Sequence, residues 1–217
     1  MYKLKILFLA RKNDKYSKQC EKYLKGKFKK VIRIDEKINS KIFNKKLNFN
    51  PDLILLFRHK SILKNDLIQK AKIACINFHP SPPSYRGMGG VNYAIYNEDK
   101  YFGCTCHLIE NQKIDSGKII HVKKFLVKKK PDLTYLLKKT HMNLQKQMLY
   151  VIPHIVSKNK INHMIQKFKH VKWSKKYYNK DHLDNFYIIK PNEKELDKKI
   201  RATYLNKYFK PIFFKKN

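Results

Sequence analysis

The stretch Ile73–Gly90 reads IACINFHPSPPSYRGMGG and joins a short apolar run to a loop rich in proline and glycine. The run Ile73–Phe78 has no helical period, which predicts a buried strand. The segment His79–Gly90 holds three of the eight prolines and three of the six glycines, so we expect a loop. Because open α/β sheets bind ligands at the carboxyl ends of parallel strands, this loop is the first candidate for a site.

Similar short apolar runs precede this strand along the chain. They are Lys5–Ala10, Val31–Ile34 and Asp52–Phe57. Segments with helical spacing, Tyr16–Phe28 and Leu63–Ala71, separate them. Strands that alternate with helices indicate right-handed crossovers and a parallel sheet. We therefore expect an α/β fold with three layers and a mainly parallel sheet.

The pattern changes after the loop. A short helix over Asn92–Tyr96 should lead into a β-hairpin formed by Gly103–Ile109 and Lys118–Val127, with Glu110–Gly117 between the strands. One long helix is expected over Leu133–Val156, which Pro153 should kink or terminate.

The last sixty residues give a weaker pattern. Lys158–Lys180 shows no periodicity, Asp181–Pro191 indicates a short extended piece, and Glu193–Tyr204 indicates a short helix. We expect one domain over residues 1–157 and a small C-terminal extension over residues 158–217 that packs on it.

The chain is strongly basic, with 50 Lys plus Arg against 16 Asp plus Glu and a net charge of +34. Almost all of this charge is lysine, since arginine occurs only at Arg11, Arg33, Arg58, Arg86 and Arg201. Together with abundant Asn, Ile, Tyr and Phe, this composition is typical of drift in an AT-rich genome. A selected nucleic-acid surface would use arginine for bidentate contacts. We therefore expect a polyanionic small substrate or cofactor rather than nucleic acid.

From other sequence signals we expect a cytoplasmic protein. The apolar run near the N-terminus is too short for a signal peptide, and no run reaches the ~18 residues of a membrane span. Cys104 and Cys106 would share one face of a strand with His107 on the other, and no second set of ligands completes a metal site. We expect free, buried thiols and no metal.

Three polar residues could carry chemistry at the expected sheet edge. Alternation aims Asn77 and His79 at the same side, and Asp115 lies at the far turn of the hairpin. An amide that stabilises an oxyanion, an imidazole that moves a proton and a carboxylate that orients it suit acyl transfer to an amine. The structural alternative has Asn77 capping the strand end, His79 packing on Pro80 and Asp115 making an Asx turn. Residue types alone leave both interpretations open.

The amino-acid sequences of these segments resemble those of one enzyme family. INFHPSPPSYRGMGG is similar to the N-x-H-P-S and aromatic-Arg-Gly loop of the formyltransferases that use 10-formyltetrahydrofolate, and YFGCTCHLIENQKIDSGKII resembles their G-x-T-x-H strand and D-x-G turn. KELDKKIRATYLNKYFKPIFF resembles the Ile-Arg-Ala segment of the branches that act on tRNA and on sugars. The resemblance implies a Rossmann-like formyltransferase core with a β-hairpin and a small C-terminal extension.

The resemblance also assigns roles to residues. The catalytic Asn, His and Asp of the family fall on Asn77, His79 and Asp115. The formyl donor 10-formyltetrahydrofolate is expected at a largely main-chain site formed by Lys60, Ser61, Ile62 and Leu63, together with Asn77. A structural alternative for that segment is a helix N-terminus capped by Ser61. Substrate contacts are expected from Ser81, Tyr85, Arg86 and Gly87.

The acceptor implied by the resemblance is a primary amine on a nucleotide-linked amino sugar. Arg11–Asp14 replaces the glycine-rich phosphate loop of the glycinamide ribonucleotide enzymes, and the chain ends before the C-terminal β-barrel of methionyl-tRNA formyltransferases. Three alternatives stay open: a methionyl-tRNA formyltransferase without that domain, a formyltetrahydrofolate hydrolase, and a non-catalytic basic protein that binds nucleic acid. A homodimer is one option for the assembly.

We predict that the charge does not confer tight RNA binding, because lysine is spread through nearly every segment. The dissociation constant for tRNA at physiological salt should be no smaller than the roughly 10⁻⁴–10⁻⁶ M that is typical of non-specific binding. Titration of labelled tRNA at several salt concentrations tests this, and sub-micromolar affinity that persists at about 0.2 M salt would contradict it.

Overall fold

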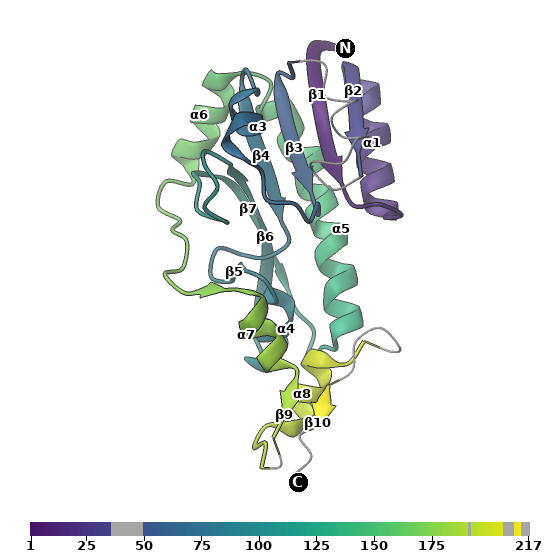
Figure 1. Ribbon diagram of the computed structural model, residues 1–217, viewed down its shortest axis with the longest axis vertical. Coiled ribbons are helices and arrows are strands. Elements are labelled where there is room, and N and C mark those ends of the chain that lie inside the picture. The colour runs from purple at the N-terminus through teal and green to yellow at the C-terminus, as the bar shows by residue number, and fades with distance from the viewer. Residues whose placement is uncertain (36–49, 191, 206–210, 214–217) are drawn as a thin grey trace.

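A six-stranded sheet forms the centre of the computed structural model, which describes residues 1–35, 50–190, 192–205 and 211–213 (Figure 1). The strand order is β2-β1-β3-β4-β6-β7. The first four of these strands pair in parallel, and β6 and β7 add as an antiparallel hairpin. The bounds are β1 Tyr2–Ala10, β2 Phe28–Ile34, β3 Leu53–Phe57, β4 Ala74–His79, β6 Tyr101–Leu108 and β7 Ile119–Leu126. The expected α/β class and mainly parallel sheet are confirmed.

Helices cover both faces of the sheet and give the three expected layers (Figure 1). One face packs against α1 (Lys15–Lys27), α5 (Leu133–Val151) and α6 (Lys158–Lys167). The other face carries α3 (Asn65–Gln69). Each residue from Ile6 to Ala10 is fully buried, as expected of a parallel strand covered on both sides.

The helix ends follow local chemistry. The Asp14 carboxylate accepts hydrogen bonds from the Ser17 N–H at 2.8 Å and the Ser17 hydroxyl at 2.7 Å, which starts α1. Asp132 caps α5 through the Tyr135 N–H at 2.8 Å. Because Pro153 has no N–H to donate, α5 ends at Val151 and continues as a 3-10 turn over Ile152–His154, so the expected termination is confirmed.

The expected absence of periodicity over Lys158–Lys180 is wrong for its first ten residues. They form α6, which Ser157 caps and which buries Ile161 and Met164. Lys, Asn and His fill most other positions of this helix, so two buried anchors were too few to reveal the period.

The extended piece expected over Asp181–Pro191 is also wrong for most of its length. Lys180–Phe186 forms helix α7, which begins with a capping box between Asn179 and His182. Only Ile188–Ile189 is a strand (β9), and Pro191 lies outside the described residues.

The lower end of the molecule in Figure 1 gathers α4, α7, α8 and two short strands. Helix α4 (Gly90–Tyr96) contacts α8 (Leu196–Thr203), and β9 pairs with β10 (Ile212–Phe213). The division at residue 157 stays a prediction. Within the extension, α6 shares its core with the central sheet, while residues 191, 206–210 and 214–217 lie outside the described ranges.

The four cysteines are free and buried, and Cys104 and Cys106 belong to the same core cluster. Their expected common face is therefore confirmed, and burial raises the pKa of both thiols far above 9.0. The metal-free state stays a prediction. In the part of the chain that is described, no helix is long and apolar enough to cross a membrane.

Candidate active site

The last residues of β4 and the last residues of its antiparallel neighbour β6 supply the polar face of the site. In the antiparallel register Asn77 lies opposite His107, and His79 lies opposite Thr105. Residues directly opposite each other share a face of the sheet, and so do residues two apart on one strand. One face at the carboxyl edge of β4 therefore presents an amide and two imidazoles.

The Asp115 carboxylate closes this group from the turn between β6 and β7. Its Oδ2 lies 3.3 Å from His79 Nδ1 and accepts from the Gly87 N–H at 3.1 Å. Its Oδ1 accepts from the Asn77 amide at 3.4 Å and lies 3.3 Å from His107 Nε2. Only 6% of Asp115 is exposed. The structure thus brings together the three residues that were predicted to be catalytic.

The turn that carries Asp115 has a constrained backbone. Asp115 adopts a left-handed conformation with φ of 45°. Arg86 Nε donates to the Ile114 carbonyl at 3.0 Å, which holds the turn against the loop after β4. A Cβ at Gly117 would lie 1.9 Å from the Leu108 carbonyl oxygen, so only glycine fits there.

The electrostatics of the His79–Asp115 pair favour a neutral imidazole beside a charged carboxylate. Burial alone would raise the pKa of Asp115, but His79, His107 and the Gly87 N–H outweigh it and lower the pKa from 3.8 to about 2. Burial lowers the pKa of His79 below 6.5, and the attraction of Asp115 opposes this without overcoming it. At neutral pH His79 is therefore able to accept a proton.

The hydrogen-bond partners of His79 suit that role. Nδ1 faces Asp115, while Nε2 lies 3.2 Å from the Tyr85 carbonyl oxygen. A neutral ring donates to only one of these acceptors, whereas an imidazolium donates to both. The site is thus arranged to stabilise the proton that His79 would receive.

His107 was not assigned a role from the sequence. Its Nδ1 is 2.8 Å from the Leu108 carbonyl, which fixes the N–H on Nδ1 and leaves Nε2 to accept from the Asn77 amide at 3.2 Å. The G-x-T-x-H resemblance was the available signal, but the register against β4 that places His107 beside Asn77 is not visible in the sequence.

The segment predicted to hold the folate follows β3 and lies beside this site. Lys60 is exposed, and the Ser61 N–H donates to His59 Nδ1 at 3.3 Å. Ile62 is 60% exposed, whereas Leu63 packs into the core with α3. Helix α3 has Lys64 at its N-cap position, so the alternative in which Ser61 caps the helix is wrong. The folate contacts themselves stay a prediction.

The predicted substrate-binding residues divide into two groups. Arg86 and Gly87 face the Asp115 turn through the contacts given above. Ser81 is buried and its carbonyl accepts from the Thr105 hydroxyl at 2.7 Å. Tyr85 is also buried, and its hydroxyl donates to Asp99 at 2.7 Å. A substrate contact from Tyr85 would therefore come from its main chain, and all four assignments stay predictions.

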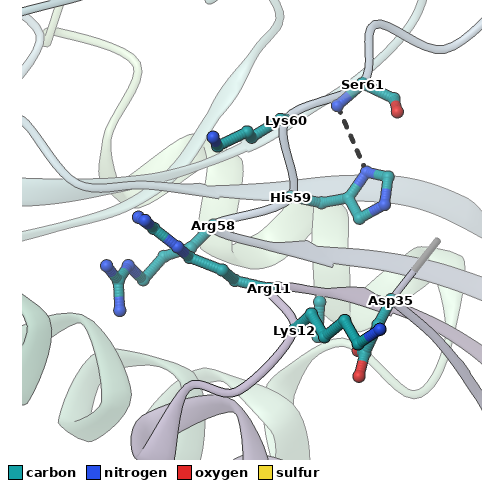
Figure 2. Close-up of a pocket in the computed structure, with 8 residues that line it drawn as sticks. Arg11, Lys12, Asp35, Arg58, His59, Lys60 and Ser61 are labelled. Carbon is teal, nitrogen blue, oxygen red and sulfur yellow. Dashed lines mark hydrogen bonds between the residues drawn. The ribbon is translucent and has the colours of Figure 1, made fainter. Parts of the chain in front are cut away.

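A cationic cavity of about 300 Å³ opens at the carboxyl ends of β1, β2 and β3 (Figure 2). Its lining consists of Ala10, Arg11, Lys12, Asp35, Arg58, His59, Lys60 and Ser61. Arg58 Nη1 contacts Asp14 Oδ1 at 2.5 Å, and Asp35 pairs with Arg33 at 2.6 Å. Because both acids already hold a guanidinium, the Arg11, Lys12 and Lys60 side chains supply the cavity with positive charge.

The chain is similar to known proteins in sequence and in fold. The formyl transferase family profile matches residues 7–152. A methionyl-tRNA formyltransferase of Borrelia garinii subsp. bavariensis is 35% identical over 92 residues, which is 42% of this chain and 29% of that protein. The chain therefore aligns with less than a third of the length of this curated relative.

Solved structures resemble the chain over nearly its whole length. A sugar N-formyltransferase from Shewanella sp. superposes with a TM-score of 0.73 at 15% identity, covering 98% of this chain and 93% of that one. An N-formyltransferase from Helicobacter canadensis, in complex with folinic acid and dTDP-3-aminofucose, gives 0.67 at 19% identity, with coverages of 92% and 80%. At these identities the likeness establishes the fold.

We predict that Asp115→Asn makes the free energy of unfolding less dependent on pH. A carboxyl whose pKa falls from 3.8 to about 2 on folding adds about 2 kcal/mol of stability at neutral pH. That contribution is complete above pH 5 and is lost as the pH falls through 3.8 toward 2. Denaturant unfolding of wild type and variant between pH 6 and pH 3 should therefore show a difference that shrinks toward acid. A constant difference would show that the Asp115 pKa is not depressed.

Proposed function

Because the chain belongs to the formyl transferase family, we propose that it transfers a formyl group from 10-formyltetrahydrofolate to a primary amine. The buried Asp115 carboxylate, which contacts Asn77, His79 and His107 at the carboxyl edge of β4, is the observation that carries this proposal. The sugar N-formyltransferase likeness over the full chain gives it further support.

The reaction follows from the positions of these groups. The amine nitrogen attacks the formyl carbon, and the carbonyl electron pair moves to the oxygen. The Asn77 amide can donate to that oxyanion, because its contact with Asp115 is long at 3.4 Å and readily exchanged. The proton lost by the amine passes to His79, whose imidazolium Asp115 and the Tyr85 carbonyl stabilise. The oxyanion then re-forms the carbonyl, the carbon–nitrogen bond to the folate breaks, and the proton held by His79 passes to the departing folate nitrogen.

We further propose that the amine belongs to a nucleotide-linked amino sugar. Ala10, Phe57 and Phe78 occupy paired positions on β1, β3 and β4, so Arg11 and Arg58 follow the same sheet edge as His79. Adjacent strands lie about 5 Å apart, which sets the cationic cavity within about 10 Å of the His79 backbone. An acceptor with its amine at His79 and its phosphates at Arg11 would fit this spacing. The dTDP-aminosugar complex of the Helicobacter structure supports this acceptor class.

Methionyl-tRNA is the second candidate acceptor. The 35% identity to a methionyl-tRNA formyltransferase and the net charge of +34 favour it. The match covers 29% of that relative, whereas the sugar enzyme is matched over 93% of its length, so we place the sugar first.

We predict that three substitutions separate catalysis from packing. Asn77→Ala should lower kcat by on the order of 10²–10³, the loss typical of removing one oxyanion donor. His79→Ala should lower kcat by on the order of 10²–10⁴. Asp115→Asn should lower kcat and shift the pH–rate profile while folate affinity stays nearly unchanged. Because the residues act as a unit, a double variant should lose far less than the product of the single losses.

The test measures kcat, folate affinity and Tm on the same preparations of each variant. Variants that are folded, bind folate and turn over like wild type would refute the catalytic assignment. A lower Tm with unchanged turnover per folded molecule would identify the residues as structural.

We predict that Arg11→Ala weakens binding of the acceptor rather than binding of the formyl donor. Loss of a charge-assisted contact, typically about 1.5–3 kcal/mol, should raise KM for a nucleotide-linked amino sugar by roughly 10- to 100-fold. The KM for 10-formyltetrahydrofolate should stay within about twofold of wild type, because the folate contacts expected from residues 60–63 are largely main-chain and do not use the Arg11 side chain. Lys3→Ala, an exposed lysine outside the cavity, is the matched control for the loss of one positive charge.

The acceptor panel should contain 3-amino and 4-amino sugars linked to dTDP and UDP, with methionyl-tRNA beside them. If methionyl-tRNA is formylated and none of the sugars is, methionyl-tRNA is the acceptor and the sugar proposal is wrong. Formate release at full rate without any amine would identify a hydrolase instead.

A further inference from the structure

The only tryptophan of the chain, Trp173, reaches the catalytic cluster from the segment between α6 and β8 (Tyr177–Tyr178). Its ring stands edge-on to His107, with centroids 5.0 Å apart and planes at 86°, and to His79 at 5.9 Å and 65°. Its Nε1–H donates to the Gly117 carbonyl at 2.8 Å. One side chain therefore contacts both histidines and the turn that carries Asp115.

The segment that follows Trp173 is held by main-chain hydrogen bonds to the loop after β4. The Ser174 N–H donates to the Pro83 carbonyl at 2.9 Å. Strand β8 then pairs in parallel with β5 (Arg86–Gly87), and the Met88 N–H donates to the Tyr178 carbonyl at 2.8 Å. The position of Trp173 is thus defined by main-chain hydrogen bonds to the loop whose Gly87 N–H binds Asp115.

The Trp173 side chain helps to bury His79 and His107. His79 is 5% exposed and His107 is 2% exposed, although both lie at the open carboxyl edge of the sheet. Trp173 itself is half-buried, so part of the indole lies against the cluster and part stays accessible to solvent.

We propose that Trp173 is a positioning residue of the catalytic cluster, which holds the Asp115–Gly117 turn against His79 and His107 and keeps water from the edge of the two rings. Formyl transfer to the amine is then favoured over transfer to water. This inference rests on the proposed catalytic role of His79. The ring and the Nε1–H contribute separately, since the ring covers the histidines and the N–H holds the turn.

Two substitutions separate these contributions. Trp173→Phe keeps an aromatic cover and removes the hydrogen bond to Gly117, whereas Trp173→Ala removes both. Lys172→Ala is the matched control, because this neighbouring residue is exposed and lies in the same segment.

Trp173→Ala should lower kcat for amine formylation by roughly 10- to 100-fold, the scale of a misplaced catalytic group. Folate affinity should stay within about threefold of wild type. The ratio of formate released to amine formylated should rise at least severalfold, because water gains access to the formyl group. Trp173→Phe should keep this ratio near the wild-type value while kcat falls less, and Lys172→Ala should match wild type in both.

The pH profile gives an independent readout. Asp115 and His107 are the titratable groups that face His79, and both remain in the variants. Since burial depresses the pKa of His79, hydration of the Trp173→Ala site should raise that pKa toward 6.5 and move the acid limb of the kcat profile to higher pH. A purely structural tryptophan would lower Tm without moving either the product ratio or this limb.

His79→Ala, assayed beside these variants, separates the two levels of inference. Full turnover in His79→Ala would overturn the proposed function and this inference with it. An inactive His79→Ala together with a wild-type product ratio and pH profile in Trp173→Ala would overturn the role of Trp173 alone. A Lys172→Ala variant that behaves like Trp173→Ala would also overturn it, since the cause would then be disturbance of the segment.

Discussion

Burial of one carboxylate, that of Asp115, is the constraint on which the arrangement of the site depends. An ionised carboxylate removed from water is costly unless hydrogen-bond donors surround it. Here the donors come from separate parts of the chain, Asn77 and His79 from β4 and the Gly87 N–H from the loop after β4. His107 from β6 packs beside the same carboxylate, with its Nε2 3.3 Å from Oδ1. The charge can stay buried only while these segments keep their positions. The same group that tunes His79 therefore also fixes the geometry of the edge.

The C-terminal segment extends this arrangement beyond the central sheet. Gly87, which donates to Asp115, lies in the two-residue strand that pairs with Tyr177–Tyr178. A Cβ at Gly87 would lie 2.2 Å from the Tyr178 carbonyl oxygen, so the two strands approach as closely as glycine permits. Arg86 packs over the Tyr177 ring at 5.5 Å and donates to the turn before Asp115. The extension is thus part of the structure that positions the carboxylate.

Sequence patterns predicted the parts of the fold that depend on short-range regularity. The apolar runs identified the four parallel strands, most clearly β1, β3 and β4, whose burial on both faces needs continuous hydrophobic sequence. The ends of those strands in turn located Asn77 and His79. His107 could not be placed in the same way, since its position beside Asn77 depends on the register of an antiparallel pair. Helix α6 was missed because Ile161 and Met164 are its only fully buried side chains.

The five arginines connect the composition to the site. Arg33 binds Glu21 and Asp35, Arg58 binds Asp14, and Arg86 donates to a main-chain carbonyl. Arg201 binds Asp197 and Glu98 and donates to the Pro131 carbonyl, and Arg11 lines the cationic cavity. A planar guanidinium with several fixed donors can serve two acceptors at once, whereas lysine supplies a mobile point charge. In this chain lysine provides most of the positive charge, whereas four of the five arginines make directed contacts to carboxylates or main-chain carbonyls. The positive charge of the cavity therefore comes from Arg11, Lys12 and Lys60 at one sheet edge, and the net charge of the whole chain is a separate property.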